Sequence, residues 1–299
     1  MRVPVTHALT FDVEDWYQGF AQRGILGWHA FASPEERNLE RILDILAAAG
    51  ATATFFVLGR YAEANARAVR LIASGGHEVA THGYAHLPVP TLTPKAFEED
   101  LRRSTSVLHS ILGSAIRGHR AMNWSIDRSC WWALEVLAEA GLSYDSSVCP
   151  TRLLSRHGVA GCPVGPHDIT LASGVRIREY PAQVLKVGGW RVPVGGGFYF
   201  RALPLALTRL ALRQSASSGS PGMVYLHPYD IDPDIPKLGG PWRFRLMRYH
   251  GLRGAAGKLR SLVRTTRFQS IWALESRSQQ GGANGPSAAQ SVPTPAGPL

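Results

Sequence analysis

The sequence has few cysteines and no long hydrophobic run. Its 299 residues include three cysteines, Cys130, Cys149 and Cys162, and no C-x-x-C pair. An odd number of widely spaced cysteines argues against a disulfide framework and a cysteine zinc site, so we expect buried thiols. No stretch approaches the roughly 18 apolar residues of a membrane span, and residues 1–10 lack the pattern of a signal peptide. These absences predict a cytoplasmic protein.

Acidic residues are nearly absent from one segment near the C-terminus. Between Lys237 and Arg277 there are ten basic residues and one acid, Glu275, and the whole chain carries a net charge of +10. The segment could contact anionic lipid headgroups at the inner face of the membrane, or phosphate groups of a lipid-linked or nucleotide-linked sugar. An ordinary solvated helix face explains the charge equally well. Without interleaved basic and aromatic residues, we expect no nucleic acid partner. The oligomeric state stays open.

Strand-like and helix-like segments alternate along the chain. Apolar runs predict strands at 7–13, 53–58, 77–81, 116–120 and 142–146, and helical spacing predicts helices at 33–50, 61–74, 93–112 and 127–140. This order is typical of right-handed βαβ units around a parallel sheet. Residues 150–174, with three prolines and four glycines, predict an inserted loop, after which strands at 175–184 and 222–226 flank a helix at 203–213. We therefore expect an α/β barrel of about seven parallel strands.

Three regions are expected along the chain. Residues 1–235 form the catalytic domain, and residues 236–275 form a basic extension packed on it. Residues 276–299 are mostly Gly, Ser, Gln, Pro and Ala, which leaves little apolar surface to bury. This tail is expected to be disordered.

Two histidines four residues apart follow the third expected strand. His82 and His86 enclose Gly-Tyr-Ala, and Gly83 indicates an irregular backbone. On one helical turn or a tight loop, both imidazoles point the same way and can share one cation. The spacing alone is a weak signal. Two histidines and one carboxylate would bind zinc or a similar divalent ion and leave one position open for water.

Three acidic residues end the first expected strand. Asp12, Glu14 and Asp15 lie there, and strand alternation puts Asp12 and Glu14 on one side. One carboxylate can bind the metal while the other acts as general base on a water. The alternative is a solvated acidic turn. Since an α/β barrel brings the carboxyl ends of its strands together, we expect the acids and the histidines to meet at one face.

Five motifs at strand ends together resemble the NodB-like polysaccharide deacetylases, carbohydrate esterase family four. The match spans about residues 5–230, and the chain is most similar to the branch that opens Phe-Asp-Val-Glu-Asp-Trp and is often encoded with exopolysaccharide biosynthesis genes. The resemblance implies a deformed barrel of the NodB type and a divalent ion, Zn²⁺ first and Co²⁺ or Ni²⁺ as alternatives. It also implies a polysaccharide or oligosaccharide substrate. The motifs are Thr10-Phe11-Asp12, His82-Gly83-Tyr84-Ala85-His86, Gly118-His119-Arg120-Ala121, Tyr144-Asp145-Ser146-Ser147 and Leu226-His227-Pro228.

The resemblance implies a role for each motif residue at the metal corner. Asp12 would be the general base, and His82 and His86 would bind the metal. The third ligand is Glu14 or Asp15, with Glu14 favoured by strand alternation and by the related Asp-x-Asp branch of the family.

The other motifs carry the acid and the groups that orient the reaction. The resemblance implies that Arg120 orients and polarises the base, that His227 protonates the leaving amine, and that Asp145 holds the His227 imidazole. Met122 stands where the family motif has proline, which affects the wall of the groove rather than the chemistry.

Three further residues are expected to bind substrate. Trp124 and Leu226 would shape a small pocket for the acetyl methyl group, although Trp124 could equally belong to the core. A backbone N–H near the turn from Tyr144 to Ser147 would stabilise the oxyanion.

The function predicted from these residues is metal-dependent hydrolysis of N-acetyl groups from an N-acetylhexosamine polysaccharide or its biosynthetic precursor, with release of acetate. One alternative is an amidohydrolase on a small or lipid-linked substrate, such as allantoin or a formamido sugar. Another is an inactive carbohydrate-binding module, which the retained titratable residues of all five motifs disfavour.

Overall fold

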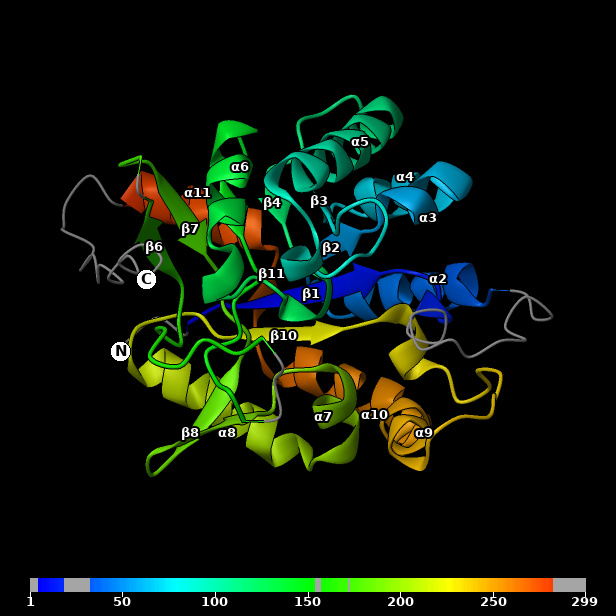
Figure 1. Ribbon diagram of the computed structural model, residues 1–299. Coiled ribbons are helices and arrows are strands. Elements are labelled where there is room, and N and C mark those ends of the chain that lie inside the picture. The colour runs from blue at the N-terminus through cyan, green and yellow to red at the C-terminus, as the bar shows by residue number, and fades with distance from the viewer. Residues whose placement is uncertain (1–4, 19–32, 154–156, 172, 282–299) are drawn as a thin grey trace.

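One curled sheet organises the molecule (Figure 1). The structure is a computed structural model that describes residues 5–18, 33–153, 157–171 and 173–281. Its nine-stranded sheet has the order β10-β1-β2-β3-β4-β5-β7-β6, with β11 beside β1. The strands are β1 (His7–Val13), β2 (Thr54–Val57), β3 (Glu78–Thr81), β4 (Gly118–His119), β5 (Tyr144–Asp145), β6 (His167–Thr170), β7 (Arg176–Glu179), β10 (Met223–Leu226) and β11 (Phe268–Gln269).

The seven strands from β10 to β7 are all parallel to their neighbours, as the sequence predicts. β6 lies antiparallel at one edge of the sheet. Within the described residues no pairing joins β6 to β10, so the barrel is an open, curled half-barrel. A separate hairpin consists of β8 (Val184–Val187) and β9 (Trp190–Pro193).

Helices cover the convex side of the sheet. In Figure 1, α3 to α6 lie above the sheet and α7 to α10 lie below it. The helices are α2 (Glu35–Ala47), α3 (Gly59–Ala64), α4 (Ala66–Ser74), α5 (Pro94–Leu112), α6 (Trp132–Glu139), α7 (Gly197–Ala202), α8 (Leu205–Ser217), α9 (Trp242–Tyr249), α10 (Leu252–Thr265) and α11 (Ile271–Gly281). Short 3-10 helices are η2 (Val89–Thr91), η3 (Met122–Trp124), η4 (Arg128–Cys130) and η5 (Pro228–Ile231).

Strand alternation separates the core from the site. Phe11 and Phe55 occupy the same register in neighbouring strands, stack at 4.9 Å and belong to the largest apolar cluster. Ala255, Leu259 and Leu262 of α10 belong to the same cluster. Core packing therefore runs across residue 235, the expected end of the catalytic domain. Asp12, on the opposite face of β1 from Phe11, is left for the site.

Several expected boundaries are corrected. The expected loop at 150–174 contains β6, and the expected strand at 175–184 is divided between β7 and the hairpin. The helix expected at 61–74 is interrupted at Asn65, where φ is −131°. Helix α11 continues to Gly281, beyond the expected start of the tail, and residues 282–299 lie outside the described part.

Two further expectations concern the cysteine thiols and membrane spans. The three cysteines are free and buried, as predicted. Among the described residues, no helix combines the length and the apolar character needed to cross a bilayer.

Candidate active site

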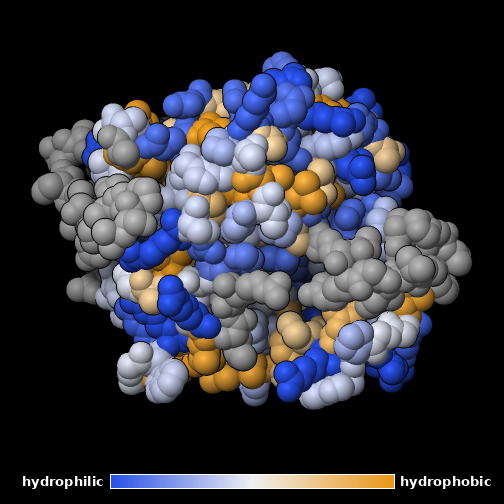
Figure 2. Space-filling view, in the orientation of Figure 1, coloured by the Kyte–Doolittle hydropathy of each residue, from blue (hydrophilic) through white to orange (hydrophobic). Residues whose placement is uncertain are grey.

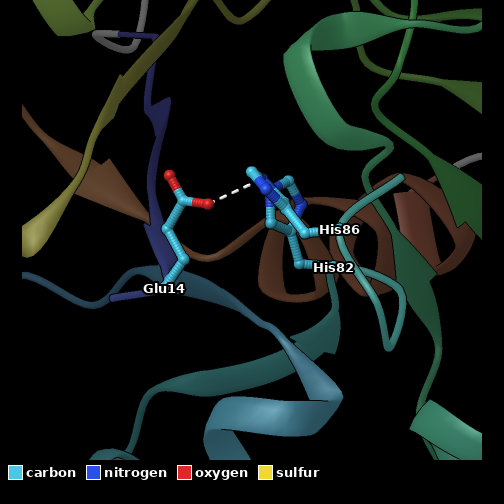
Figure 3. A group of neighbouring side chains, drawn as sticks. All are labelled: Glu14, His82 and His86. Atoms are coloured by element: carbon cyan, nitrogen blue, oxygen red, sulfur yellow. Dashed lines mark ion pairs between the residues drawn. The ribbon is translucent and has the colours of Figure 1, made fainter. Parts of the chain in front are cut away.

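The carboxyl ends of β1 and β3 bring one carboxylate and two imidazoles together. One ligand atom each from Glu14, His82 and His86 lies within 4.8 Å of the others, and all three residues are buried. Figure 3 shows the Glu14 carboxylate pointing across a gap toward the two imidazole rings. Glu14 Oε2 is 2.6 Å from His86 Nε2. The two histidines and the strand-end acid therefore meet as the sequence predicts.

The loop that carries the histidines has an unusual backbone. Gly83 has φ = 74° and His86 has φ = 58°, a value that residues with a Cβ rarely adopt. The carboxylate of Asp100 in α5 accepts hydrogen bonds from the backbone N–H groups of Tyr84 (2.7 Å) and Ala85 (2.9 Å) and so fixes the loop. The histidines thus lie on an irregular loop rather than a helical turn. No sequence signal linked Asp100 to this loop.

His82 is prepared to bind a metal through one nitrogen. Its Nδ1–H donates to the carbonyl oxygen of Arg120 at 2.8 Å, which leaves Nε2 with its lone pair toward the centre of the cluster. Burial lowers the pKa of His82 to about 4, so its imidazole is neutral near pH 7. A neutral imidazole is the form that coordinates metals.

Glu14 supplies the negative charge of the set. Burial alone would raise the pKa of Glu14, but the neighbouring imidazole of His86 lowers it below the ordinary range. The buried Oε2 makes its close contact with His86 Nε2, at 2.6 Å. Two imidazole nitrogens and one carboxylate oxygen, all buried and within 4.8 Å of one another, fit a tetrahedral divalent cation with one open position.

Asp12 and Arg120 form a buried ion pair beside this set. Arg120 donates from Nη1 to Asp12 Oδ1 at 2.6 Å and is completely buried. Its guanidinium group lies between the rings of Phe56 and Trp124, at 4.0 and 4.4 Å from their centroids. The planar group therefore has little freedom to rotate, and it holds one Asp12 oxygen while Oδ2 faces the site.

His227 follows β10, which pairs directly with β1. Its Nε2 lies 3.9 Å from Asp12 Oδ2 and 3.9 Å from Glu14 Oε1. Burial would lower the pKa of His227, but the Asp230 carboxylate raises it above the ordinary value. A protonated imidazole facing the base and the ligand carboxylate is suited to act as a general acid.

The expected partner of His227 is wrong. Asp230, not Asp145, accepts the hydrogen bond from His227 Nδ1–H, at 2.9 Å, and also accepts from the His227 backbone N–H. Asp145 is in β5, four places from β1 in the sheet, and accepts instead from His119 Nδ1 (2.8 Å) and Ser147 Oγ (2.7 Å). The motif after β10 contained this signal, since an acid three residues after a histidine can reach back within one 3-10 turn.

Asp15 turns away from the metal corner. Its carboxylate accepts hydrogen bonds from the hydroxyl groups of Tyr17 (2.7 Å) and Ser33 (2.9 Å), and it is not part of the ligand cluster. Glu14, not Asp15, faces the two histidines as the candidate third ligand, because successive side chains of an extended chain point to opposite sides.

Tyr144 and Leu226 are buried away from the site. The Tyr144 side chain has no exposed surface and its hydroxyl donates to Glu78 at the start of β3, the opposite end of the strands. Leu226 lies in the main core, in register with Phe11. Its neighbour Tyr225, in register with Thr10, faces the site side and contacts the Trp124 ring at 5.3 Å. A one-residue shift changes the face of a strand, and this explains the misplaced leucine.

Two of the expected oxyanion donors near Tyr144, the backbone N–H groups of Tyr144 and Ser146, are occupied. The backbone N–H groups of Tyr144, Ser146 and Val148 donate to other groups of the protein, namely Arg117 O, His119 O and Glu179 Oε1. The Trp124 side chain is mostly buried and packs against the Arg120 guanidinium, and its backbone has φ = 55°. Met122 lines the same small hollow as His86.

Tyr229 is a further site residue that the sequence did not single out. Its ring stacks on His227 with a centroid distance of 4.6 Å and an interplanar angle of 9°. Its hydroxyl donates to Glu14 Oε1 at 3.0 Å. Tyr229 therefore contacts both the acid and the ligand carboxylate.

Comparison with known families divides the chain in two. Residues 5–144 match the polysaccharide deacetylase family, with both histidines, Asp12, Glu14 and Arg120 inside the match. Residues 5–144 belong to the polysaccharide deacetylases. Residues 146–275 match a domain of unknown function (DUF3473), so His227 and Asp230 lie outside the deacetylase family match.

Curated relatives of the deacetylase domain include proteins named as peptidoglycan and chitooligosaccharide deacetylases. The chain is 29% identical to a peptidoglycan deacetylase of Helicobacter pylori over 113 residues, or 38% of each protein. It is also 29% identical to a chitooligosaccharide deacetylase of Rhizobium leguminosarum bv. trifolii over 193 residues, 57% of this chain and 86% of that protein. The chain thus spans little more than a third of the Helicobacter relative.

A solved structure shows the same fold. The crystal structure of a proposed polysaccharide deacetylase from Mycobacterium smegmatis aligns with a TM-score of 0.60 and 18% identity, over 98% of this chain and 97% of that one. The likeness covers the deacetylase domain and the segment after it, which agrees with the continuous core across both parts.

Proposed function

We propose that the protein hydrolyses the N-acetyl group of an N-acetylhexosamine unit in a polysaccharide, or in its biosynthetic precursor, and releases acetate. One observation carries the proposal: the base candidate Asp12, the acid candidate His227 and the ligand carboxylate Glu14 face one small space, with His227 Nε2 3.9 Å from each carboxylate. An acid and a base on two sides of a cation site are what amide hydrolysis requires.

The cation would polarise the carbonyl group and lower the pKa of a water molecule. Glu14, His82 and His86 would hold it. Asp12 accepts the proton of the attacking water at Oδ2, while Arg120 keeps Oδ1 occupied and the carboxylate oriented. His227 gives the proton on Nε2 to the nitrogen of the departing amine, because an unprotonated amine anion is a poor leaving group.

The substrate class follows from the relatives. Peptidoglycan and chitooligosaccharide deacetylases align with the deacetylase domain, and their named substrates share N-acetylglucosamine units. The chain resembles the branch of the family that is often encoded with exopolysaccharide biosynthesis genes. This resemblance favours an exopolysaccharide or its lipid-linked precursor over a cell-wall polymer.

Acetate release by metal-loaded protein tests the proposal. Protein stripped with a chelator and reloaded with Zn²⁺, Co²⁺ or Ni²⁺ is incubated with N-acetylglucosamine oligomers and exopolysaccharide precursors, and acetate, formate and ureides are measured. We expect acetate only from the reloaded protein, and none from Asp12→Asn, which retains its metal. Formate or ureides without acetate would favour the small-substrate amidohydrolase, and protein that binds no stoichiometric metal would favour an inactive module.

A further inference from the structure

We propose that the segment 146–275, which matches a domain of unknown function, completes the deacetylase site by fixing His227 through Asp230 and Arg201. This inference rests on the proposed function. It gives the segment a task that the deacetylase family match does not contain, since Arg201, His227 and Asp230 all lie after residue 144.

A chain of three charged groups leads from α7 to the reaction centre. Arg201 donates from Nε to Asp230 Oδ1 at 2.8 Å, and Asp230 Oδ2 accepts from His227 Nδ1–H at 2.9 Å. Both Arg201 and Asp230 are almost completely buried. Burial alone would raise the pKa of Asp230, but the Arg201 and His227 charges lower it, so the carboxylate stays ionised.

Arg201 is itself held on every side. Its Nη2 donates to the Met247 carbonyl at 2.6 Å, and its Nη1 donates to the His250 carbonyl, both at the end of α9. Lys258 of α10 donates to the carbonyl oxygens of Phe200, Arg201 and Leu203 and caps the end of α7. The arginine thus joins three helices of the C-terminal half to one carboxylate in the site.

The ring of Tyr229 adds a second support from the same half. One face of this ring stacks on His227. The Arg248 guanidinium of α9 lies 3.7 Å from the Tyr229 centroid, and Arg248 also donates to the Trp16 carbonyl. Stacking on Tyr229 fixes the orientation of the imidazole plane, and the hydrogen bond to Asp230 fixes the direction of Nδ1. Nε2 is therefore aimed between Asp12 and Glu14.

Precise aim matters because proton transfer depends steeply on geometry. A displacement of about 1 Å can cost about a hundredfold in rate. Asp230 and Arg201 are therefore positioning residues: they act through His227 and leave the metal ligands and the substrate contacts of the deacetylase domain unchanged. Their loss should lower kcat and leave KM and metal content nearly constant.

The test compares three variants of the metal-loaded, full-length protein. Asp230→Asn removes the charge at constant size, and we expect kcat to fall about 100-fold, with KM within about threefold and unchanged metal stoichiometry. Asp230→Glu restores a carboxylate and should recover at least about tenfold of that loss. Arg201→Lys keeps a positive charge but not the fork of donors, and should lower kcat about tenfold.

Asp232→Asn is the matched control. Asp232 is a buried carboxylate two residues further on, which accepts hydrogen bonds from Arg37 and Asn38 instead of His227. It should leave kcat within about twofold of the wild type even if thermal stability falls. Equal losses of kcat in Asp230→Asn and Asp232→Asn, or no advantage of Asp230→Glu over Asp230→Asn, would overturn the inference.

A spectroscopic measurement separates this inference from the proposed function. In protein with ¹⁵N-labelled histidine, the His227 Nδ1 proton should give a downfield resonance that shifts upfield in Asp230→Asn, because a neutral amide is a weaker acceptor than a carboxylate. Wild-type protein that shows this resonance but releases no acetate would refute the proposed function alone. Absence of the resonance from folded wild-type protein would refute the positioning role. If Asp230→Asn does not fold, the shift of the same resonance is measured in Arg201→Lys instead.

Discussion

At the scale of single residues, two adjacent carboxylates differ in what they can bind. Glu14 faces His82 and His86, whereas Asp15 is held by the hydroxyl groups of Tyr17 and Ser33. We expect Glu14→Gln to weaken zinc binding by more than about 100-fold, since loss of a direct ligand exceeds the effect typical of outer contacts. Asp15→Asn should change affinity only a few fold. Competition with a chromophoric chelator measures both, and the reverse order would show that Asp15 is the ligand.

His7 links the stability of the fold to pH. Burial lowers its pKa to about 4, and its Nδ1 accepts a hydrogen bond from the Gly222 backbone N–H, which a protonated ring cannot do. The unfolded chain therefore binds this proton more readily, and the stability due to His7 is complete above its unfolded pKa of 6.5 and decreases as pH falls toward 4.

The expected loss due to His7 is about 2 kcal/mol in the free energy of unfolding between pH 7 and pH 5. His7→Asn keeps an acceptor atom and does not titrate, so its stability should decrease less over this interval. Urea unfolding of both proteins at the two pH values measures the difference. Parallel decreases would exclude His7 as the source.

At the scale of elements, a glycine lets β10 approach the segment before α7. A Cβ at Gly196 would lie 1.9 Å from the Tyr225 carbonyl oxygen, and residues 196 and 225 form a parallel bridge. Gly196→Ala must displace backbone, and we expect it to lower the free energy of unfolding by about 3 kcal/mol. Gly189→Ala in the β8–β9 turn, where nothing lies within 4 Å, is the control and should stay within about 0.5 kcal/mol of wild type. Thermal and urea unfolding measure both changes, and similar losses would contradict the role of the close approach.

Element type was predictable where one physical signal dominated. A continuous apolar run located β2, because a strand buried on both faces is apolar throughout, and alternation ending in acids located β1. The segment from 150 to 193 was harder. β6 alternates buried and exposed residues over only four positions, and the edge hairpin β8–β9 has few buried residues, so turn residues dominated the local pattern.

At the scale of the whole molecule, the basic C-terminal segment has both internal and exposed parts. Arg248 and Lys258 bind inside the protein, whereas Trp242, Leu246 and Met247 of α9 are 68%, 48% and 50% exposed. Figure 2 shows frequent hydrophobic residues along the lower edge, where α7, α8 and α9 lie. Contact with an anionic membrane surface stays a prediction.

We expect the protein to sediment with vesicles that contain anionic lipid and not with neutral ones, because basic residues and exposed apolar side chains act together at a membrane interface. Trp242→Ala should lower the partition coefficient of the protein onto anionic vesicles about tenfold. Trp190→Ala in the hairpin, with the same 68% exposure, is the control. Equal effects, or no sedimentation with either vesicle, would contradict the prediction.

The fold and the cluster of Glu14, His82 and His86 could be predicted together because strand ends converge in any parallel barrel. Asp12 lies near the end of β1, Glu14 directly follows it, and His82 and His86 follow β3. The partner of His227 could not be fixed this way, since choosing between Asp145 and Asp230 requires knowing that β5 lies four places from β1 in the sheet while η5 directly follows β10. Local spacing favoured Asp230, and the family motif favoured Asp145.

The adjacency of β1 and β10 has a consequence during synthesis. His227 leaves the ribosome more than two hundred residues after Asp12, yet the strands β1 and β10 are neighbours in the sheet. Chain entropy makes so distant a pairing a late event in folding. The proposed acid His227 and the proposed base Asp12 therefore meet only after β10 has emerged and docked, so under the proposed function a nascent chain gains activity late.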